Sequence, residues 1–448
     1  SLGSNTTGAT NVGVGKNALY ANTTASENTA VGAYAADANT TGTANTAVGY
    51  VALSANTTAS DNTAFGKGAL EANTTGTANT AVGKSALDAN TTSAYNTAVG
   101  ANAGGSNTGG TQNTYIGWGA GANSTTGSQN TYIGSAVAYA AENTGSYNTV
   151  VGREAFHSTT TGASCVAVGY QALQDTTTGS NNVAVGKSAL TNTTTGYNNI
   201  AIGSSSLAAL TTSYHNTAIG LEALTANTTG YSNIAIGNYA MDGNTTSSNN
   251  VAIGYHALGA TNTVGGNTAI GKGALAANTS GARNTAIGKD AMLTNTTGAQ
   301  NTAVGEESLE DNTTGNYNTA IGRNALNSNT TADSNTSVGQ SSLSDNTTGA
   351  NNTAVGKSAL ADNTTGASNV AVGKDALDTN TTGASNVAIG MDSMDANTTG
   401  DSNVAVGFQA LATNTTASNN VAIGKDALLY NTTGTGNTAV GQGAGAAV

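Results

Sequence analysis

The chain has 448 residues, no proline, 60 glycines and only 8% charged residues, whereas ordinary globular domains carry about 25%. Its net charge of −12 disfavours nucleic acids and anionic membranes as partners. Hydrophobic residues reach 37%, but about half of them are alanine, so the composition argues against a series of domains with conventional large cores. Either disorder or a repeat structure that buries little per residue is compatible with these values.

A strict repeat decides between these two possibilities. Glycines recur every 17 residues from Gly15 to Gly441, which makes 26 copies with one inserted residue between Gly134 and Gly152. Asn28–Ala44 is a nearly ideal copy, and we number its residues as positions 1 to 17 of the repeat. Val or Ile occupies position 4 in 25 copies. Because disordered chains do not keep aliphatic residues at fixed positions, the period predicts a solenoid over residues 1–448.

Each copy is predicted to form one coil of a parallel β-solenoid. The run N-[TV]-A-[VI]-G, as in 28–32, alternates in the manner of a short strand, and the Thr-Thr pair, as in 40–41, can supply a second strand. Glycine at position 5, and often at position 15, marks corners that require a positive φ. Seventeen residues are too few for a pair of helices, so the predicted fold is all-β with about 26 stacked coils.

The predicted core is small. We expect the Val or Ile of position 4 and the Leu of position 9 to point inward, each contributing about 1.5–3 kcal/mol. Position 2 lies on the same strand face as position 4. Position 3 is almost always Ala, and because an exposed position would vary more, we expect it to pack as well, either against a partner chain or inside a very thin coil.

Asparagine at position 1 is predicted to form a ladder from coil to coil, as in stacked cross-β structures. Cys165 replaces one asparagine of this ladder and is expected to be a buried substitute. The ladder includes Asn28, Asn45, Asn62, Asn79 and Asn96.

A second asparagine, at position 12, begins the recurring Asn-Thr-Thr sequence. This sequence matches the acceptor pattern for N-glycosylation, but it is also typical of a turn, because Asn tolerates left-handed conformations. The candidate glycosylation sites are Asn5, Asn22, Asn39, Asn56, Asn73, Asn90, Asn227, Asn244, Asn312, Asn346, Asn363, Asn380 and Asn397.

The stretch 101–147 breaks the pattern. Position 9 is Gly104, Gly121 and Ala138 in three successive copies, so the leucine row is interrupted, and the inserted residue falls in the same region. Tyr115 and Tyr132 replace the alanine of position 3, and the chain's one tryptophan, Trp118, lies nearby. We expect a local change of packing here, with a receptor patch formed by these three aromatic residues as the alternative.

The array is cut within a repeat at both ends. It starts at position 8 with Ser1 and stops at position 12 with Val448. No initiator methionine, signal peptide or hydrophobic spanning segment is evident. We therefore expect a piece of a longer polypeptide or a processed subunit.

The repeat N-T-A-V-G-x-x-A-L-x-x-N-T-T-G-x-x, as in 79–95, resembles arrays of phage tail fibres and of tail-fibre-type bacterial surface proteins. It is also similar to the head repeats of trimeric autotransporter adhesins. The resemblance implies a parallel β-roll, left-handed and homotrimeric, that serves as a stalk or adhesive head. It implies an extracellular, cell-surface or virion location, with copies of the chain itself and cell-surface glycans as partners.

The sequence therefore predicts a structural fibre with a spacer or attachment role and no catalysis. His157, His215 and His256 occupy different repeat positions, and no catalytic triad, metal-ligand cluster or phosphate loop is evident, so we expect no cofactor and no metal. A glycosylated head-to-tail extracellular filament is one alternative. An ice-binding solenoid is another, although threonine at position 2 alternates with Val and Ile, which makes the array irregular.

Overall fold

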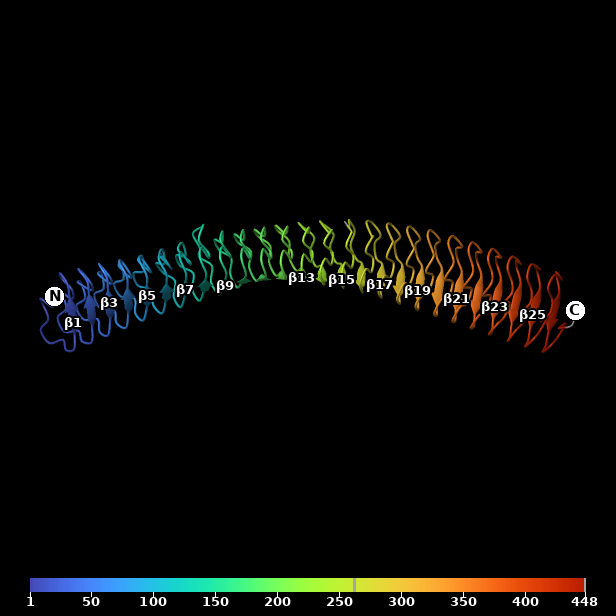
Figure 1. Cartoon of the computed structure of the whole chain (residues 1–448), viewed down its shortest axis with the longest axis horizontal. Helices are drawn as coiled ribbons and strands as arrows, with labels where there is room; N and C mark the ends of the chain where they lie inside the picture. Colours follow the sequence, from blue (N-terminus) through green and yellow to red (C-terminus); the bar gives the residue numbers. More distant parts are fainter. Residues whose placement is uncertain (261–262, 447–448) are drawn as a thin grey trace. The chain divides into compact units, whose positions relative to one another are not determined.

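The computed structural model describes residues 1–260 and 263–446, which fall into two compact units, Ser1–Thr229 and Gly230–Val448. Each unit is a stack of 17-residue coils, and each coil contributes one three-residue strand at positions 2 to 4 (Figure 1). Successive strands within a unit pair in parallel and in register, so that Thr46 opposes Thr63 and Ala47 opposes Ala64. The predicted parallel β-solenoid is thereby confirmed within each unit.

The strands of the first unit are β1 (Val12–Val14), β2 (Thr29–Val31), β3 (Thr46–Val48), β4 (Thr63–Phe65), β5 (Thr80–Val82), β6 (Thr97–Val99), β7 (Thr114–Ile116), β8 (Thr131–Ile133), β9 (Thr149–Val151), β10 (Val166–Val168), β11 (Val183–Val185), β12 (Ile200–Ile202) and β13 (Thr217–Ile219). Those of the second unit are β14 (Ile234–Ile236), β15 (Val251–Ile253), β16 (Thr268–Ile270), β17 (Thr285–Ile287), β18 (Thr302–Val304), β19 (Thr319–Ile321), β20 (Thr336–Val338), β21 (Thr353–Val355), β22 (Val370–Val372), β23 (Val387–Ile389), β24 (Val404–Val406), β25 (Val421–Ile423) and β26 (Thr438–Val440).

The second predicted strand, at positions 13 and 14, is wrong. Thr40 and Thr41 form a bend, although the amide of Thr40 still donates to the carbonyl oxygen of Thr57 in the next coil at 2.9 Å. The amide of Thr41 donates to the same carbonyl oxygen at 3.2 Å, and two amides that share one acceptor make a bend rather than the alternating pairing of a strand. The coil therefore consists of one strand and a long series of turns.

Those turns depend on ordinary residues in the left-handed region. In the coil of β3, Val51, Leu53 and Asp61 have φ values of 52°, 55° and 62°. Each of their amides donates to a carbonyl of a neighbouring coil: Val51 to Ala33 at 3.1 Å, Leu53 to Ala69 at 2.9 Å and Asp61 to Thr43 at 3.1 Å. These inter-coil bonds offset the steric cost of a positive φ, which is about 1–3 kcal/mol for a non-glycine residue.

The two glycine positions differ. At position 5 the expectation is confirmed, because Gly83 has φ +135° and a Cβ there would lie 2.5 Å from the carbonyl oxygen of Gly100 in the next coil. At position 15 it is wrong, because Gly42 has no positive φ and Ala59 fills the same position one coil later. Only position 5 therefore requires glycine for its backbone conformation.

The core contains the alanine of position 3 and the alanine and leucine of positions 8 and 9, and it does not contain the Val or Ile of position 4. Ala64 at position 3 and Ala69 and Leu70 at positions 8 and 9 are fully buried, as expected for positions 3 and 9. The prediction for position 4 is wrong, since Phe65 is 55% exposed and Ile116 38%. Because side chains alternate along a strand, burying position 3 turns positions 2 and 4 outward together.

Candidate functional site

The outward face of the strands forms a row of partly exposed aliphatic side chains, which we call the aliphatic stripe. It consists of position 4, which is Val or Ile and once Phe, together with position 2 in those coils where Val or Ile stands there in place of Thr, as in β10, β11 and β12. The members that are exposed by more than a third in the first unit are Val12, Val14, Val31, Phe65, Val99, Ile116, Val168, Ile200 and Ile202. Those in the second unit are Ile234, Ile287, Ile321, Val355, Ile389, Ile423 and Val440.

The stripe is an unusual surface for a soluble protein. Large contiguous apolar patches on such proteins mark interaction sites, whereas scattered exposed aliphatic residues do not. Here the parallel in-register pairing places equivalent side chains of successive coils directly beside one another, as Val82 lies beside Val99. The apolar surface therefore extends along each unit instead of being broken into separate spots.

The predicted asparagine ladder of position 1 is confirmed. The side chains of Asn28, Asn45, Asn62, Asn79 and Asn96 are buried. Asn62 Oδ1 accepts from the backbone amide of Asn79 at 3.0 Å, and Asn79 Nδ2 donates to the carbonyl oxygen of Ser93 at 2.9 Å. The ladder thus runs mainly from side chain to backbone, and it ties each coil both to the next coil and to its own turn.

Cys165 is a buried substitute in this ladder, as expected. Its backbone amide donates to Asn148 Oδ1 of the preceding coil at 2.9 Å, as the amides of the ladder asparagines do, and its Sγ lies 3.5 Å from the carbonyl oxygen of Gly179. Burial raises the pKa of the Cys165 thiol to about 11, so the thiol stays protonated at neutral pH.

The asparagines of position 12 form a second buried ladder. Asn56 Nδ2 donates to Asn39 Oδ1 at 2.8 Å and to the carbonyl oxygen of Ala59 at 2.9 Å. Of the candidate glycosylation sites only Asn5 is part-exposed; the others, Asn22, Asn39, Asn56, Asn73, Asn90, Asn227, Asn244, Asn312, Asn346, Asn363, Asn380 and Asn397, are completely buried. The nitrogen that would carry a glycan is therefore inaccessible in these coils, and the turn interpretation fits the geometry.

The three aromatic residues proposed as a receptor patch do not form one. Tyr115 and Tyr132 are fully buried and lie 5.8 Å apart between ring centroids, whereas Trp118 is 55% exposed. A Cβ on Gly104 would lie 2.6 Å from Cδ2 of Tyr115, so the tyrosine ring occupies the space of the missing leucine. The expected change of packing in this stretch is confirmed, and of the three aromatic residues only Trp118 is exposed.

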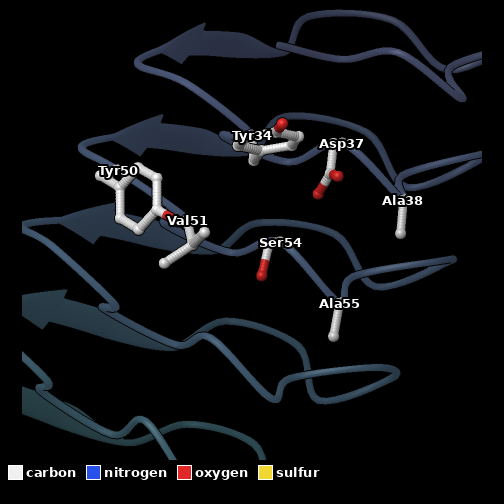
Figure 2. Close-up of a pocket in the computed structure, with 7 residues that line it drawn as sticks. All are labelled: Tyr34, Asp37, Ala38, Tyr50, Val51, Ser54 and Ala55. Carbon is white, nitrogen blue, oxygen red and sulfur yellow. The ribbon is translucent and has the colours of Figure 1, made fainter. Parts of the chain in front are cut away.

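A depression of about 460 Å³ lies on the side of the first unit (Figure 2). It spans two coils and extends from Tyr34 and Tyr50 past Asp37 and Ser54 to the methyl groups of two alanines (Figure 2). The two rings meet edge to face at 6.3 Å, and the ammonium of Lys16 lies 5.2 Å from the centroid of Tyr34. Burial raises the pKa of Asp37 above its usual value.

This depression lacks the elements of a catalytic site, because no nucleophile lies in hydrogen-bond contact with a base in it. The three histidines are separate, and each packs against a tyrosine ring: His157 on Tyr139, His215 on Tyr197, and His256 on Tyr255. Over residues 1–260 and 263–446, no three His, Cys, Asp or Glu side chains gather in a way that could hold a metal ion.

Nothing helical in the described part of the chain has the length and apolar character that a membrane crossing needs. No protein-family model matches the chain, and no curated protein matches its sequence.

Proposed function

We propose that this chain is a structural fibre protein that assembles with copies of itself into an extracellular or virion-borne rod. In this role it spans distance and attaches to a host or other surface, and it performs no catalysis. The observation that carries the proposal is the aliphatic stripe, because a stack of coils with one apolar side, as each unit has, is suited to lateral assembly along its length.

The energetics favour assembly through the stripe. Burying apolar surface contributes about 25 cal/mol per Å². Every coil adds the apolar side chain of position 4 to the same interface, and a second one where position 2 is Val or Ile. Each contact is small, but the contributions accumulate with length, as they do for stacked repeats. A homotrimer would bring three stripes to a common axis, and the resemblance of the repeat to left-handed trimeric rolls supports that number and that hand.

Solution mass tests the assembly. Light scattering coupled to size-exclusion chromatography should give three times the chain mass of 43.4 kDa. Replacing Val82 and Val99 of the stripe together by Asp should weaken or abolish the oligomer, because two unpaired charges would be buried in the interface. Thr75→Asp is the matched control, since Thr75 is exposed but lies outside the stripe.

Two results would contradict the proposal. A monodisperse monomer at micromolar concentration would exclude self-assembly through the stripe. An oligomer that survives the Val82/Val99 double substitution but is lost in the Thr75 control would move the interface to another face.

Ice binding is a second candidate that the outward direction of position 2 favours. Threonine fills position 2 in eight successive coils, from β2 to β9, with Val, Phe or Ile two residues later on the same face. Such rows of hydroxyl and methyl groups on a solenoid can order water. Thermal hysteresis of the purified chain tests this candidate, and because it needs a free stripe, a trimer through the same face would contradict it.

The glycosylated filament is less well supported. Buried acceptor nitrogens at position 12 leave no room for a glycan in the folded coils, so this alternative would have to rely on accessible acceptors such as the part-exposed Asn5 or the exposed Asn192 and Asn351, which also begin Asn-x-Thr sequences. An intact mass in excess of the sequence mass would reinstate it.

A further inference from the structure

The inserted residue of the array produces a local bulge. The amide of Ala140 donates to the carbonyl oxygen of His157 at 2.9 Å, and that of Thr144 donates to Thr160 at 2.7 Å, which keeps the inter-coil pairing of positions 11 and 13. Three residues lie between these two anchors, where a regular coil has only the asparagine of position 12. Ala141 and Glu142 are therefore the extra residues, and position 14 is skipped after Thr144.

The same coil carries an exposed aromatic stack. Tyr139 lies between Trp118 of the preceding coil and His157 of the following coil, with ring centroids 5.3 and 6.2 Å apart and both interplanar angles 28°. Gly119 makes the stack possible, because a Cβ there would lie 2.7 Å from Cε2 of Tyr139. The stack ends at Trp118, since the equivalent position of the coil before it is Ala101. The indole, 55% exposed, therefore has a face that no ring of the described chain covers.

A polar pocket of about 300 Å³ lies on the coils that carry Trp118 and Tyr139 and on the coil before them. It is lined by Ser106, Asn123, Thr125 and Glu142. Asn123 Nδ2 donates to the carbonyl oxygen of Tyr139, and Thr125 Oγ1 donates to Glu142 Oε1 at 3.3 Å. The segment 139–142 thus connects the two features, because it supplies the middle ring of the stack and one wall of the pocket.

We propose that this bulge site binds a neutral glycan, with one sugar ring on the free face of Trp118 and sugar hydroxyls in the pocket. The apolar C–H face of a pyranose packs on an aromatic ring, and its hydroxyl groups donate to carboxylate and amide oxygens such as those of Glu142 and Asn123. Glu142 disfavours anionic sugars. A quaternary ammonium ligand is a poorer fit, because it prefers a cage of rings on several sides and these rings are within 28° of parallel.

The proposal rests on the attachment role of the fibre and specifies where attachment occurs. A glycan array of neutral, sialylated and sulfated glycans, probed with the intact fluorescently labelled chain, identifies the ligands. Because Trp118 is the chain's one tryptophan, its intrinsic emission then reports directly on titration with each bound oligosaccharide. We expect neutral glycans to bind and to change the emission.

Three variants locate the site. Trp118→Ala should weaken binding to the neutral glycans by about tenfold or more, and Glu142→Gln should weaken it without lowering the melting temperature, since both side chains lie at the surface. Tyr50→Ala is the matched control, because Tyr50 is 52% exposed on the same unit but lies outside the bulge site, and it should bind as the unchanged chain does.

Several outcomes would overturn the glycan site. They are binding that persists in both Trp118→Ala and Glu142→Gln, the absence of any neutral glycan among the bound ligands, and a response of Trp118 emission to phosphocholine alone. The oligomeric state is measured on the same samples, so a trimer without glycan binding would remove the site and leave the fibre proposal intact.

Discussion

At the scale of single residues, the coil depends on backbone conformations that most amino acids avoid. Position 5 needs glycine for two reasons. Its φ lies far outside the range that other residues adopt, and its Cα faces a carbonyl group of the next coil, which leaves no room for a Cβ. Positions 7, 9 and 17 also have positive φ, yet they accept Leu, Ser, Tyr or Asp. The left-handed region that these three positions occupy is only unfavourable for non-glycine residues, whereas the φ of position 5 is forbidden to them.

A pair of glycine substitutions tests this difference. Gly83→Ala should lower the free energy of unfolding by about 3 kcal/mol or more, because it adds a clash with Gly100 to a forbidden φ. Gly68→Ala, at position 7, should cost only about 1 kcal/mol, since its Cβ meets nothing closer than a flexible carboxylate of Glu71 at 3.0 Å. Chemical denaturation of both variants provides the comparison, and equal losses would contradict the steric argument.

The ladder of position 1 allows a stabilising substitution. Cys165→Asn should raise the free energy of unfolding by about 1 kcal/mol, because an amide can donate to Gly179 as Asn148 Nδ2 donates to Gly162 at 3.0 Å. The reverse change, Asn79→Cys, should destabilise the chain by a similar amount. Denaturant midpoints measure both, and a loss of stability in Cys165→Asn would show that the ladder is not limiting there.

At the scale of elements, the sizes of the side chains at positions 3 and 9 of neighbouring coils compensate each other. Where glycine replaces leucine at position 9, tyrosine replaces alanine at position 3, and its ring fills the vacated core. The core of a coil therefore accepts a large side chain from either wall, provided that the opposite wall is small. This exchange explains why the stretch 101–147 keeps the same strand register despite its different sequence.

A double-substitution cycle tests the exchange. Tyr115→Ala should lower the free energy of unfolding by about 3–5 kcal/mol by leaving a cavity. Gly121→Leu, at position 9 of the same coil, should also destabilise on its own, because its Cβ would lie 2.4 Å from Cδ1 of Tyr115. The two changes together restore the regular pattern and should recover most of the loss. Additive losses in the double variant would contradict compensation.

Carboxylates on adjacent coils make stability depend on pH. Burial, together with Asp362, Asp395 and Asp375, raises the pKa of Asp378 to about 6. The folded chain binds this proton more tightly than the unfolded chain, so the melting temperature should rise as the pH falls from 7 towards 5. Asp378→Asn should be more stable at pH 7 and should flatten this rise, whereas an unchanged pH profile would assign the effect to other groups.

At the scale of the whole molecule, each coil contacts chiefly its two neighbours, so stability is expected to accumulate coil by coil. Removing residues 352–368, one complete repeat of the second unit, should therefore leave a folded chain with a slightly smaller denaturant m-value, because less surface is exposed on unfolding. Circular dichroism and urea unfolding measure both quantities. Removing 352–367 instead is the control: it leaves one extra residue, which must either shift alanine and valine to the wrong faces or loop out as a bulge, so this variant should be less stable than the one that lacks 352–368.

The sequence by itself determines the architecture of a coil stack. The 17-residue period, the glycine of position 5, the asparagine ladder of position 1 and the buried leucine of position 9 could all be read from it, because each reflects a constraint that every coil repeats. The sequence also shows that the stretch 101–147 differs from the rest, because the inserted residue, Trp118 and the missing leucines all fall within it.

Only the tertiary structure decided which strand face is outside. Alternation along three residues is compatible with either choice, and hydrophobicity favoured the valine face. The narrow interior instead takes position 3, which is alanine in most coils because the leucine of position 9 already fills much of the space, although Val150 is buried there in the same coil as Phe156. The same geometry buries the position 12 asparagines and aligns Trp118 with Tyr139 and Glu142. The burial of these asparagines and the position of Trp118 depend on contacts between residues 17 or more apart in the sequence, and the pattern within one repeat does not contain such contacts.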